Sequence, residues 1–313
     1  MEAGTQAASA APRARSLGVA RRRWGEEVIR GLLFLAAMVS VLTTVGIVFA
    51  LVEESLSFFG EVGTRFFTDS KWSPLFADPQ YGIWQLLNGT FLITGIAILV
   101  AVPLGLGSAV YLSEYASNRV RRIAKPILEV LVGVPTIVFG YFALVFVTPT
   151  ILQDFLKLDI DLFNALAAGL VMGIMVVPTI ASISEDSMRA VPQGLREGAF
   201  GLGATRRQVA TKVVFPAAIS GIVASIVLGI SRAVGETMIV LIAAGLAPNT
   251  GLNPTESYAT ITTFMGATAK GDNPAGTIGY ESIFACGLTL FVLTLFMNMI
   301  AIRFVRRYRE VYE

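Results

Sequence analysis

Six long apolar segments limit what this chain can fold into. Each holds about 20 residues with few charges, which is the length that an α-helix needs to cross a bilayer. The segments are 31–52, 89–112, 126–147, 162–183, 215–245 and 282–302. Backbone polar groups inside a bilayer must be satisfied within the segment, so we expect an all-α integral membrane protein with six transmembrane helices. The composition agrees, since 54% of the residues are hydrophobic and only 15% are charged.

The positive charges gather in alternate connections between these segments. Nineteen of the 24 Lys and Arg residues lie before residue 31, in 113–125, in 184–214 and after Ile302. Cytoplasmic loops carry the excess of Lys and Arg. We therefore expect both termini in the cytoplasm.

The ends and the first outer loop differ in composition from the spans. Residues 1–28 are rich in Ala, Gly, Ser and Arg and predict a disordered basic cytoplasmic tail, with 29–313 as the transmembrane domain. A cleaved signal peptide is the rival interpretation, but 31–52 is longer than a usual signal core. The predicted outer loop 53–85 contains FFGEVGTRFF and WSP, which suit interface anchoring better than a docked partner.

Residues 191–216 form a polar, basic insert between apolar segments and carry local helix signals. Pro192 suits a first helical turn, Gly203 suits the left-handed residue after a helix, and Thr205 with Gln208 forms a capping box. Pro216 marks the entry into the fifth apolar segment. The pattern predicts a helix, a sharp bend and a second helix joined to a transmembrane span.

The sequence offers little for catalysis or for metal binding. It has no histidine, a single cysteine at Cys286, and no GxxxxGK[ST] phosphate-binding loop. We expect no catalytic residue, no metal, no cofactor and no nucleic-acid partner. Any nucleotide energy that drives the protein must be supplied by another chain.

Charged and hydroxyl residues inside the spans indicate an anion pathway. Arg232 lies 17 residues after Phe215, about 25 Å along a continuous helix, which places it near the bilayer centre. Glu236 is four residues further and would share its helix face. A buried guanidinium favours passage of an oxyanion. The alternative is a structural salt bridge in which Arg232 never touches substrate.

Three further features of the spans bear on packing and on this pathway. Thr237 follows Glu236, and Thr136 follows Pro135, which should kink the third span. Both threonines are candidate pathway residues, although a Thr hydroxyl commonly bonds back to its own helix. Gly169 and Gly173 form a GxxxG face that either admits a neighbouring helix or reflects the frequency of small residues in membrane helices.

The insert resembles the EAA loop of ABC importer permeases. Glu197, Gly198 and Ala199 match the first triplet, Gly203 follows at the family's spacing, and Val213-x-Phe215-Pro216 matches Ile-x-Leu-Pro. Three positions depart from the pattern by small or apolar replacements. The resemblance implies a cytoplasmic coupling helix within a coupling loop, 184–214, that docks on a separate ATPase.

Several longer stretches resemble the PstC-type permease of the phosphate-specific ABC importer. They are PLGLGSAVYLSEYA at 103–116, KPILEVLVGVPTIVFGYFAL at 125–144 and SRAVGETMIV at 231–240. The resemblance implies a type I ABC importer permease fold and a multi-pass location in a bacterial or archaeal cell (inner) membrane. It also implies a homologous second permease subunit, an ATPase dimer and an extracytoplasmic phosphate-binding protein as partners. The alternatives are a permease for sulfate or molybdate, and an ATP-independent channel or scaffold.

Overall fold

The computed structural model describes residues 24–271 and 274–308, and these are mostly helical. The chain divides into two units, Met1–Ala50 and Leu51–Glu313, which are described separately. The first unit contains the beginning of helix α1 (Trp24–Val62), so the last residues of the predicted tail are helical. Residues 1–23 of that predicted tail lie outside the described residues.

The second unit holds the remaining elements. Its main helices are α3 (Trp84–Val110), α4 (Asn118–Val132), α5 (Thr136–Phe142), α6 (Ala165–Arg189), α7 (Gln193–Gly201), α10 (Ile219–Val234), α11 (Met238–Ala243), α12 (Ile261–Thr268) and α13 (Ile278–Tyr308). Short elements are α2 (Arg65–Thr68), α8 (Arg206–Val209), α9 (Phe215–Ala217) and the π-helical stretches η1 (Tyr111–Tyr115), η2 (Ala143–Phe155) and η3 (Ala210–Val214). Strands β1 (Trp72–Ser73) and β2 (Gln80–Tyr81) pair antiparallel.

Within the described residues, five helical stretches are long and apolar enough to cross a membrane. They are Gly25–Val62, Trp84–Tyr115, Thr136–Phe155, Ala165–Arg189 and Ile278–Arg303. A sixth crossing arises if the bent pair Arg206–Ala217 and Ile219–Val234 is one span. Each of the six predicted spans overlaps one of these stretches or the bent pair, but the third and the fifth are not single straight helices.

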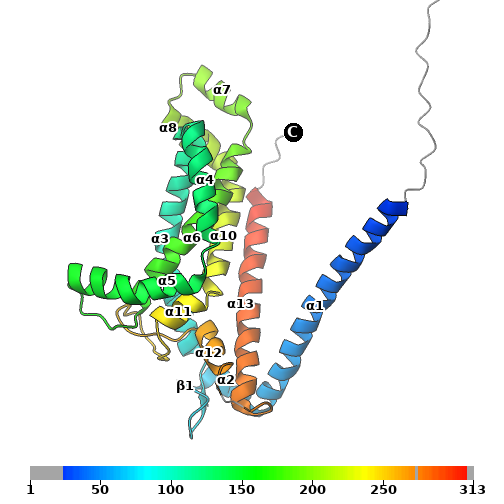
Figure 1. The fold of residues 1–313 in the computed structure, drawn as a ribbon, viewed down its shortest axis with the longest axis vertical. Helices are drawn as coiled ribbons and strands as arrows, with labels where there is room; N and C mark the ends of the chain where they lie inside the picture. The colour runs from blue at the N-terminus through cyan, green and yellow to red at the C-terminus, as the bar shows by residue number, and fades with distance from the viewer. Residues whose placement is uncertain (1–23, 272–273, 309–313) are drawn as a thin grey trace, which may run out of the picture. The chain divides into compact units, whose positions relative to one another are not determined.

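The third segment breaks at the proline that was expected to kink it. Helix α4 ends at Val132, and Pro135 is the N-cap of α5. Helix α5 and η2 then turn away from the direction of α3, α6 and α10 (Figure 1). Helix α5 instead packs on α11 at Gly140, where an added Cβ would lie only 3.1 Å from the Met238 carbonyl oxygen.

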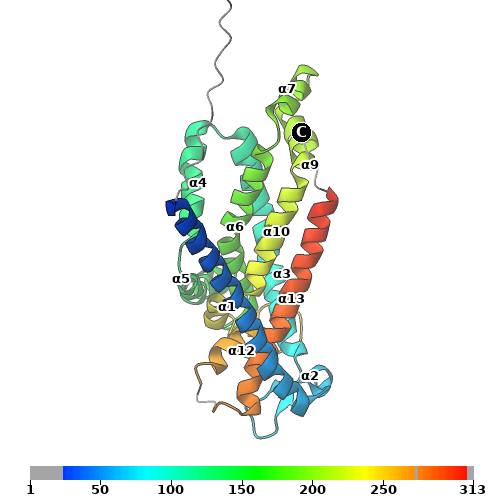
Figure 2. The same ribbon diagram turned by 90° about the vertical axis from the view of Figure 1, so that its right-hand side faces the viewer.

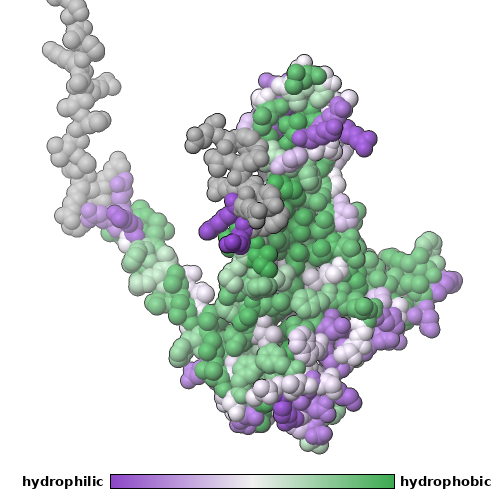
Figure 3. Space-filling model, turned by 180° about the vertical axis from the view of Figure 1, so that it is seen from behind, coloured by the Kyte–Doolittle hydropathy of each residue, from purple (hydrophilic) through white to green (hydrophobic). Residues whose placement is uncertain are grey.

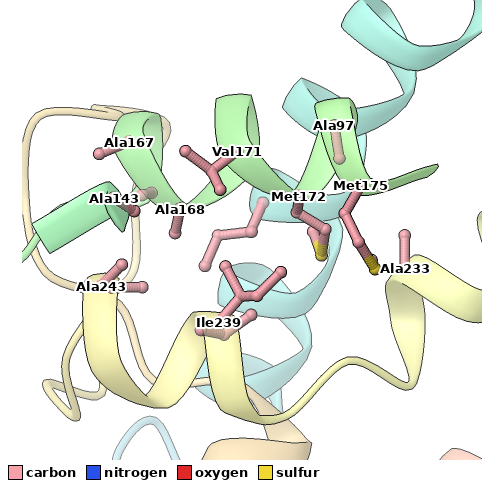
Figure 4. Packing of buried hydrophobic residues seen from close by; sticks show 14 of the residues in the cluster. Ala97, Ala143, Ala167, Ala168, Val171, Met172, Met175, Ala233, Ile239 and Ala243 are labelled. Carbon is pink, nitrogen blue, oxygen red and sulfur yellow. The ribbon is translucent and has the colours of Figure 1, made fainter. Parts of the chain in front are cut away.

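Helix α6 lies at the centre of the packing and contacts α3 most closely. A Cβ on Gly169 would lie 2.7 Å from Ile96, and one on Gly173 would lie 2.8 Å from the Ala97 carbonyl. The GxxxG face therefore admits α3. Figure 2 shows α3, α6, α10 and α13 side by side, and Figure 4 shows Met172 and Met175 of α6 packed in the main apolar core.

The aromatic residues of the predicted outer loop build a core of their own. Helix α1 continues to Val62, so the connection to α3 is shorter than expected. Phe58, Phe66, Trp72 and Tyr81 are buried and meet edge to face, and Phe264 of α12 packs on Trp72. These rings stabilise the α12 end of the second unit instead of facing lipid.

The surface of the second unit is apolar over its helices. Figure 3 shows a broad hydrophobic area between hydrophilic groups near α8 and hydrophilic groups at the α12 end. Many exposed residues of α5 and α13 are large and apolar, including Tyr141, Val292 and Ile300. Such a surface needs lipid or another apolar chain to cover it.

Candidate functional site

Residues 191–216, called the coupling segment after the role that is predicted for them, form the helix, bend and helix that the sequence indicated. Helix α7 begins after Pro192, which serves as its N-cap, and Gly203 adopts a φ of +83° after the helix ends. The Thr205 side chain accepts from the Gln208 backbone N–H, and the Gln208 side chain accepts from the Thr205 backbone N–H, which completes the capping box. Both local predictions are confirmed.

The residues of the EAA resemblance lie on the exposed part of this segment. Glu197 and Gly198 are exposed on α7, and Ala199 is partly buried. Leu202, at the tip of the bend, is 92% exposed. Pro216 lies in the short helix α9 and is exposed. Leu195 and Phe200 of α7 are exposed as well, so the segment presents several apolar side chains to its surroundings.

Arg196 fixes α7 to α6 and η1, and the sequence interpretation missed it. It is 9% exposed. Its guanidinium donates to Glu114 of η1 at 3.0 Å and to the backbone carbonyls of Met188 and Val191 at the end of α6. Both side chains of this ion pair are nearly buried, since only 11% of the Arg196 side chain and 10% of the Glu114 side chain are exposed. The sequence carries no signal for this role, because Arg196 is one of several basic residues in its loop.

A second ionic cluster joins α4 to α6 nearby. The Glu185 carboxylate, 1% exposed, accepts from Lys125 Nζ at 2.8 Å and lies 3.8 Å from Arg121 and 3.9 Å from Arg189. Lys125 also contacts Asp186. Partial burial lowers the pKa of Lys125, but its hydrogen bonds to the two carboxylates outweigh burial and raise the pKa above its ordinary value. Lys125 is therefore charged throughout the physiological pH range.

The helical path from the coupling segment to Arg232 is bent. Helix α9 ends at Ala217, and the axis turns by 72° before α10 begins at Ile219. The expectation of one continuous helix from Phe215 is therefore wrong. Beyond the bend, α10 packs tightly on α6, where Ser184 and Ser225 share a buried hydrogen bond of 2.7 Å and Gly221 leaves no room beside Ser187.

A second break separates Arg232 from Glu236. Helix α10 ends at Val234 and α11 begins at Met238 (Figure 4). Since the two residues no longer share one helix, the expected ion pair is wrong, and no carboxylate of the described residues lies within ion-pair distance of Arg232. Arg232 donates instead to the Thr179 hydroxyl of α6 at 3.1 Å.

Glu236 organises the start of α11. Its carboxylate accepts from the backbone N–H groups of Met238 at 3.0 Å and Ile239 at 3.3 Å, which satisfies donors that a helix start leaves free. Its backbone carbonyl accepts from the Thr262 hydroxyl at 2.7 Å. Glu236 thus holds the link between α10 and α11 in place.

Threonines surround the link between α10 and α11. Thr90 and Thr94 of α3 and Thr260 before α12 line a gap beside Glu236 that is too narrow for a water molecule. The sequence interpretation missed these three, although Thr90 belongs to a short Asn-Gly-Thr sequence at the start of the second apolar segment. Several hydroxyl groups meet where the helix is broken.

Three of the four predicted pathway residues, Arg232, Glu236 and Thr237, lie at or next to the link between α10 and α11, and the fourth, Thr136, lies on a helix that packs on α11. Thr237 lies in the link itself, beside Gly266 of α12, and Thr136 starts α5, which packs on α11. Arg232 faces α6 through Thr179.

The chain is similar to known membrane transport proteins over most of its length. Residues 101–310 match the family described as binding-protein-dependent transport system inner membrane component. The chain is 34% identical over 247 residues to a probable ABC transporter permease protein, YqgH, of Bacillus subtilis, with 79% of each chain covered. It is 32% identical over 288 residues to the phosphate transport system permease protein PstC of Haemophilus influenzae, covering 87% of this chain and 90% of the relative.

Solved structures show the same fold. A chain of a bacterial alginate ABC transporter, solved with an alginate pentasaccharide-bound periplasmic protein, superposes with a TM-score of 0.65 at 14% identity, covering 94% of this chain and all of the other. A chain of the MetNI methionine ABC transporter in an inward-facing conformation superposes with a TM-score of 0.55 at 20% identity, covering 73% of this chain and 95% of the other. The fold is that of type I ABC importer permeases, and this multi-pass membrane chain belongs to the family of binding-protein-dependent transport system inner membrane components.

Proposed function

We propose that this chain is the membrane-spanning permease subunit of an ATP-driven inorganic phosphate importer. The similarity to permeases named for phosphate transport covers most of the chain, which supports this choice over sulfate or molybdate. The absence of a phosphate-binding loop sequence assigns ATP hydrolysis to a separate subunit. The chain itself then supplies part of the pathway and the contact that transmits motion.

The observation that carries the proposal is Arg232 at the break between α10 and α11. An arginine within a membrane helix costs about 2.5–3.5 kcal/mol on insertion scales. No carboxylate neutralises it among the described residues, and Thr179 satisfies only one of its five donors. A partly buried guanidinium with free donors is suited to a phosphate, which presents several acceptor oxygens and one to two negative charges.

The residues around Arg232 have separate roles in this proposal. Glu236 does not compete for the guanidinium, because its carboxylate caps α11. Thr237 offers a hydroxyl group at the N-cap of α11, and Thr136 offers one at the start of α5, the helix that packs on α11. An anion that enters when the subunits separate would meet a charge and several neutral donors.

The coupling segment is the proposed contact with the ATPase. Glu197, Gly198, Ala199 and Gly203 present α7 and its bend to the cytoplasm, and Pro216 marks the return to the membrane. The other proposed partners are a homologous second permease, a second copy of the ATPase and an extracytoplasmic phosphate-binding protein. The apolar surface of the second unit supports such an assembly within the bilayer.

Uptake of labelled phosphate into vesicles that carry the complete complex tests the proposal. Arg232→Gln should abolish uptake while assembly and nucleotide hydrolysis persist, because the charge is lost and the packing on α6 is kept. Thr179→Val is the matched control, since it removes only the neutral partner and should retain most of the uptake. Loss of assembly in Arg232→Gln would assign the arginine a structural role. Strong inhibition of the unmodified complex by excess sulfate would contradict the assignment to phosphate.

A further inference from the structure

A cavity at the α7 end of the second unit is lined by arginines that the proposed pathway does not use. Its volume is about 360 Å³, and it lies between the coupling segment and the membrane helices. Arg206 of α8 lines it from the coupling segment, and Arg121 of α4 and Arg189 of α6 line it from the membrane helices. We call this space the arginine cavity.

The three arginines have donors to spare. Arg121 and Arg189 approach Glu185 only through their Nε atoms, at 3.8 and 3.9 Å, and one Glu185 oxygen accepts no hydrogen bond. Arg206 is exposed, and no carboxylate of the described part of the chain lies within ion-pair distance of it. Arg196 also lines the cavity, but Glu114 and two carbonyls already engage it.

Positive charge exceeds negative charge around the arginine cavity. The groups that line it or contact its arginines are four cations and two carboxylates: Arg121, Arg189, Arg196 and Arg206, with Glu114 and Glu185. Lys125 and Asp186, which join this cluster through Glu185 and through each other, add one charge of each sign. An adjacent cavity of about 610 Å³ shares Arg121 and Arg189 with the arginine cavity. It adds Arg122 and Glu129, whose charges cancel, so the excess of positive charge is unchanged. A ligand with one to two negative charges would balance it.

We infer that the arginine cavity binds a phosphate group and that this ligand ties the coupling segment to α4 and α6. A tetrahedral phosphate can accept from guanidinium groups on several sides at once, which matches arginines supplied by three helices. Bridging Arg206 to Arg121 and Arg189 would restrain α7 and α8, the segment that the ATPase is proposed to move. The assignment of this end to the cytoplasm rests on the proposed function. The phosphate group then comes either from imported inorganic phosphate or from an anionic lipid headgroup.

Hydrogen exchange of the complete complex in nanodiscs tests this inference without transport. In zwitterionic lipid, added inorganic phosphate should slow exchange of the backbone amides of 193–209 by about tenfold, the effect of one or two added charged hydrogen bonds. Arg206→Gln should remove this protection. Arg207→Gln is the matched control, since Arg207 is the next residue and does not line the cavity, and it should keep the protection.

Other outcomes distinguish inorganic phosphate from a lipid headgroup as the ligand, or overturn the inference. Protection that appears only with phosphatidylglycerol in the nanodisc, and not with inorganic phosphate, would assign the site to a lipid headgroup. Equal protection in both variants, or none in any condition, would overturn the inference. Loss of the ATPase subunits from the Arg206→Gln complex would also overturn it, because the arginine would then be a docking contact. Phosphate uptake, measured separately, shows whether the proposed function has failed instead.

Discussion

The close contact between α3 and α6 allows a quantitative test through Gly173. A Cβ at Gly173 would lie 2.8 Å from the Ala97 carbonyl oxygen and 2.9 Å from Val100 Cβ. Both distances are shorter than a normal van der Waals contact, and one obstacle is backbone, which cannot rotate away. Gly173→Ala must therefore push the two helices apart locally. Gly95→Ala is the matched control, because Gly95 lies within α3 and a Cβ added there would meet nothing within 4 Å.

The expected magnitudes differ between the two variants. Either substitution gains up to about 1 kcal/mol because alanine favours a helix more than glycine does. Only Gly173→Ala also costs about 1–3 kcal/mol for the forced repacking of a tight interface. The difference of about 1–3 kcal/mol corresponds to an unfolding midpoint on the order of 5 °C lower for Gly173→Ala than for Gly95→Ala.

The single cysteine provides the assay. Cys286 is fully buried and reacts with a thiol-specific fluorophore only when its surroundings open. The complex is heated with the fluorophore, and the labelled band of this chain is measured after electrophoresis, so that cysteines of other subunits do not interfere. A midpoint for Gly173→Ala equal to or above that of Gly95→Ala would refute the contact between α3 and α6 as described.

Two further predictions concern the coupling segment. Gly203→Ala places a side chain at a φ of +83°, which costs about 1–2 kcal/mol, and should lower the amount of phosphate imported per ATP hydrolysed. Gly201→Ala is the control, because a Cβ added at Gly201 on α7 meets nothing within 4 Å, and it should leave this ratio unchanged. An unchanged ratio in both variants would contradict the role of the bend. Arg196→Met leaves Glu114 buried without its cation, which costs about 3–5 kcal/mol, so limited proteolysis within 190–210 should accelerate. Adding Glu114→Gln should restore part of the protection, and an unaltered cleavage rate in Arg196→Met would exclude an anchoring role.

The features that the sequence predicted well are those set by short-range chemistry. The capping box of Thr205 and Gln208 involves residues three apart, and the left-handed turn at Gly203 needs only a residue without Cβ. The length of the apolar segments alone predicts the spans, because a helix needs about 20 apolar residues to cross a bilayer. The break at Pro135 follows from a missing backbone donor.

The features that the sequence did not predict depend on tertiary contacts. Pairing Arg232 with Glu236 assumed one helix, but capping of α11 by Glu236 and its carbonyl contact with Thr262 favour a break. The aromatic residues after α1 were assigned to the interface because an edge-to-face cluster with Phe264, far away in the sequence, leaves no local pattern. Arg196 was one of several basic residues in its loop, and only burial distinguishes it.

The two breaks change how motion of the coupling segment can reach Arg232. Along the chain, the path passes through the 72° bend at Ala218, where a change in backbone angles can absorb rotation. A second path crosses space, because Arg196 holds α7 to the end of α6 and α6 holds Arg232 through Thr179. Along that path α6 is one helix of 25 residues, packed on α10 through Ser184 and Ser225. Since a packed helix transmits displacement better than a bent link, α6 is the stiffer connection between the coupling helix and the proposed anion site.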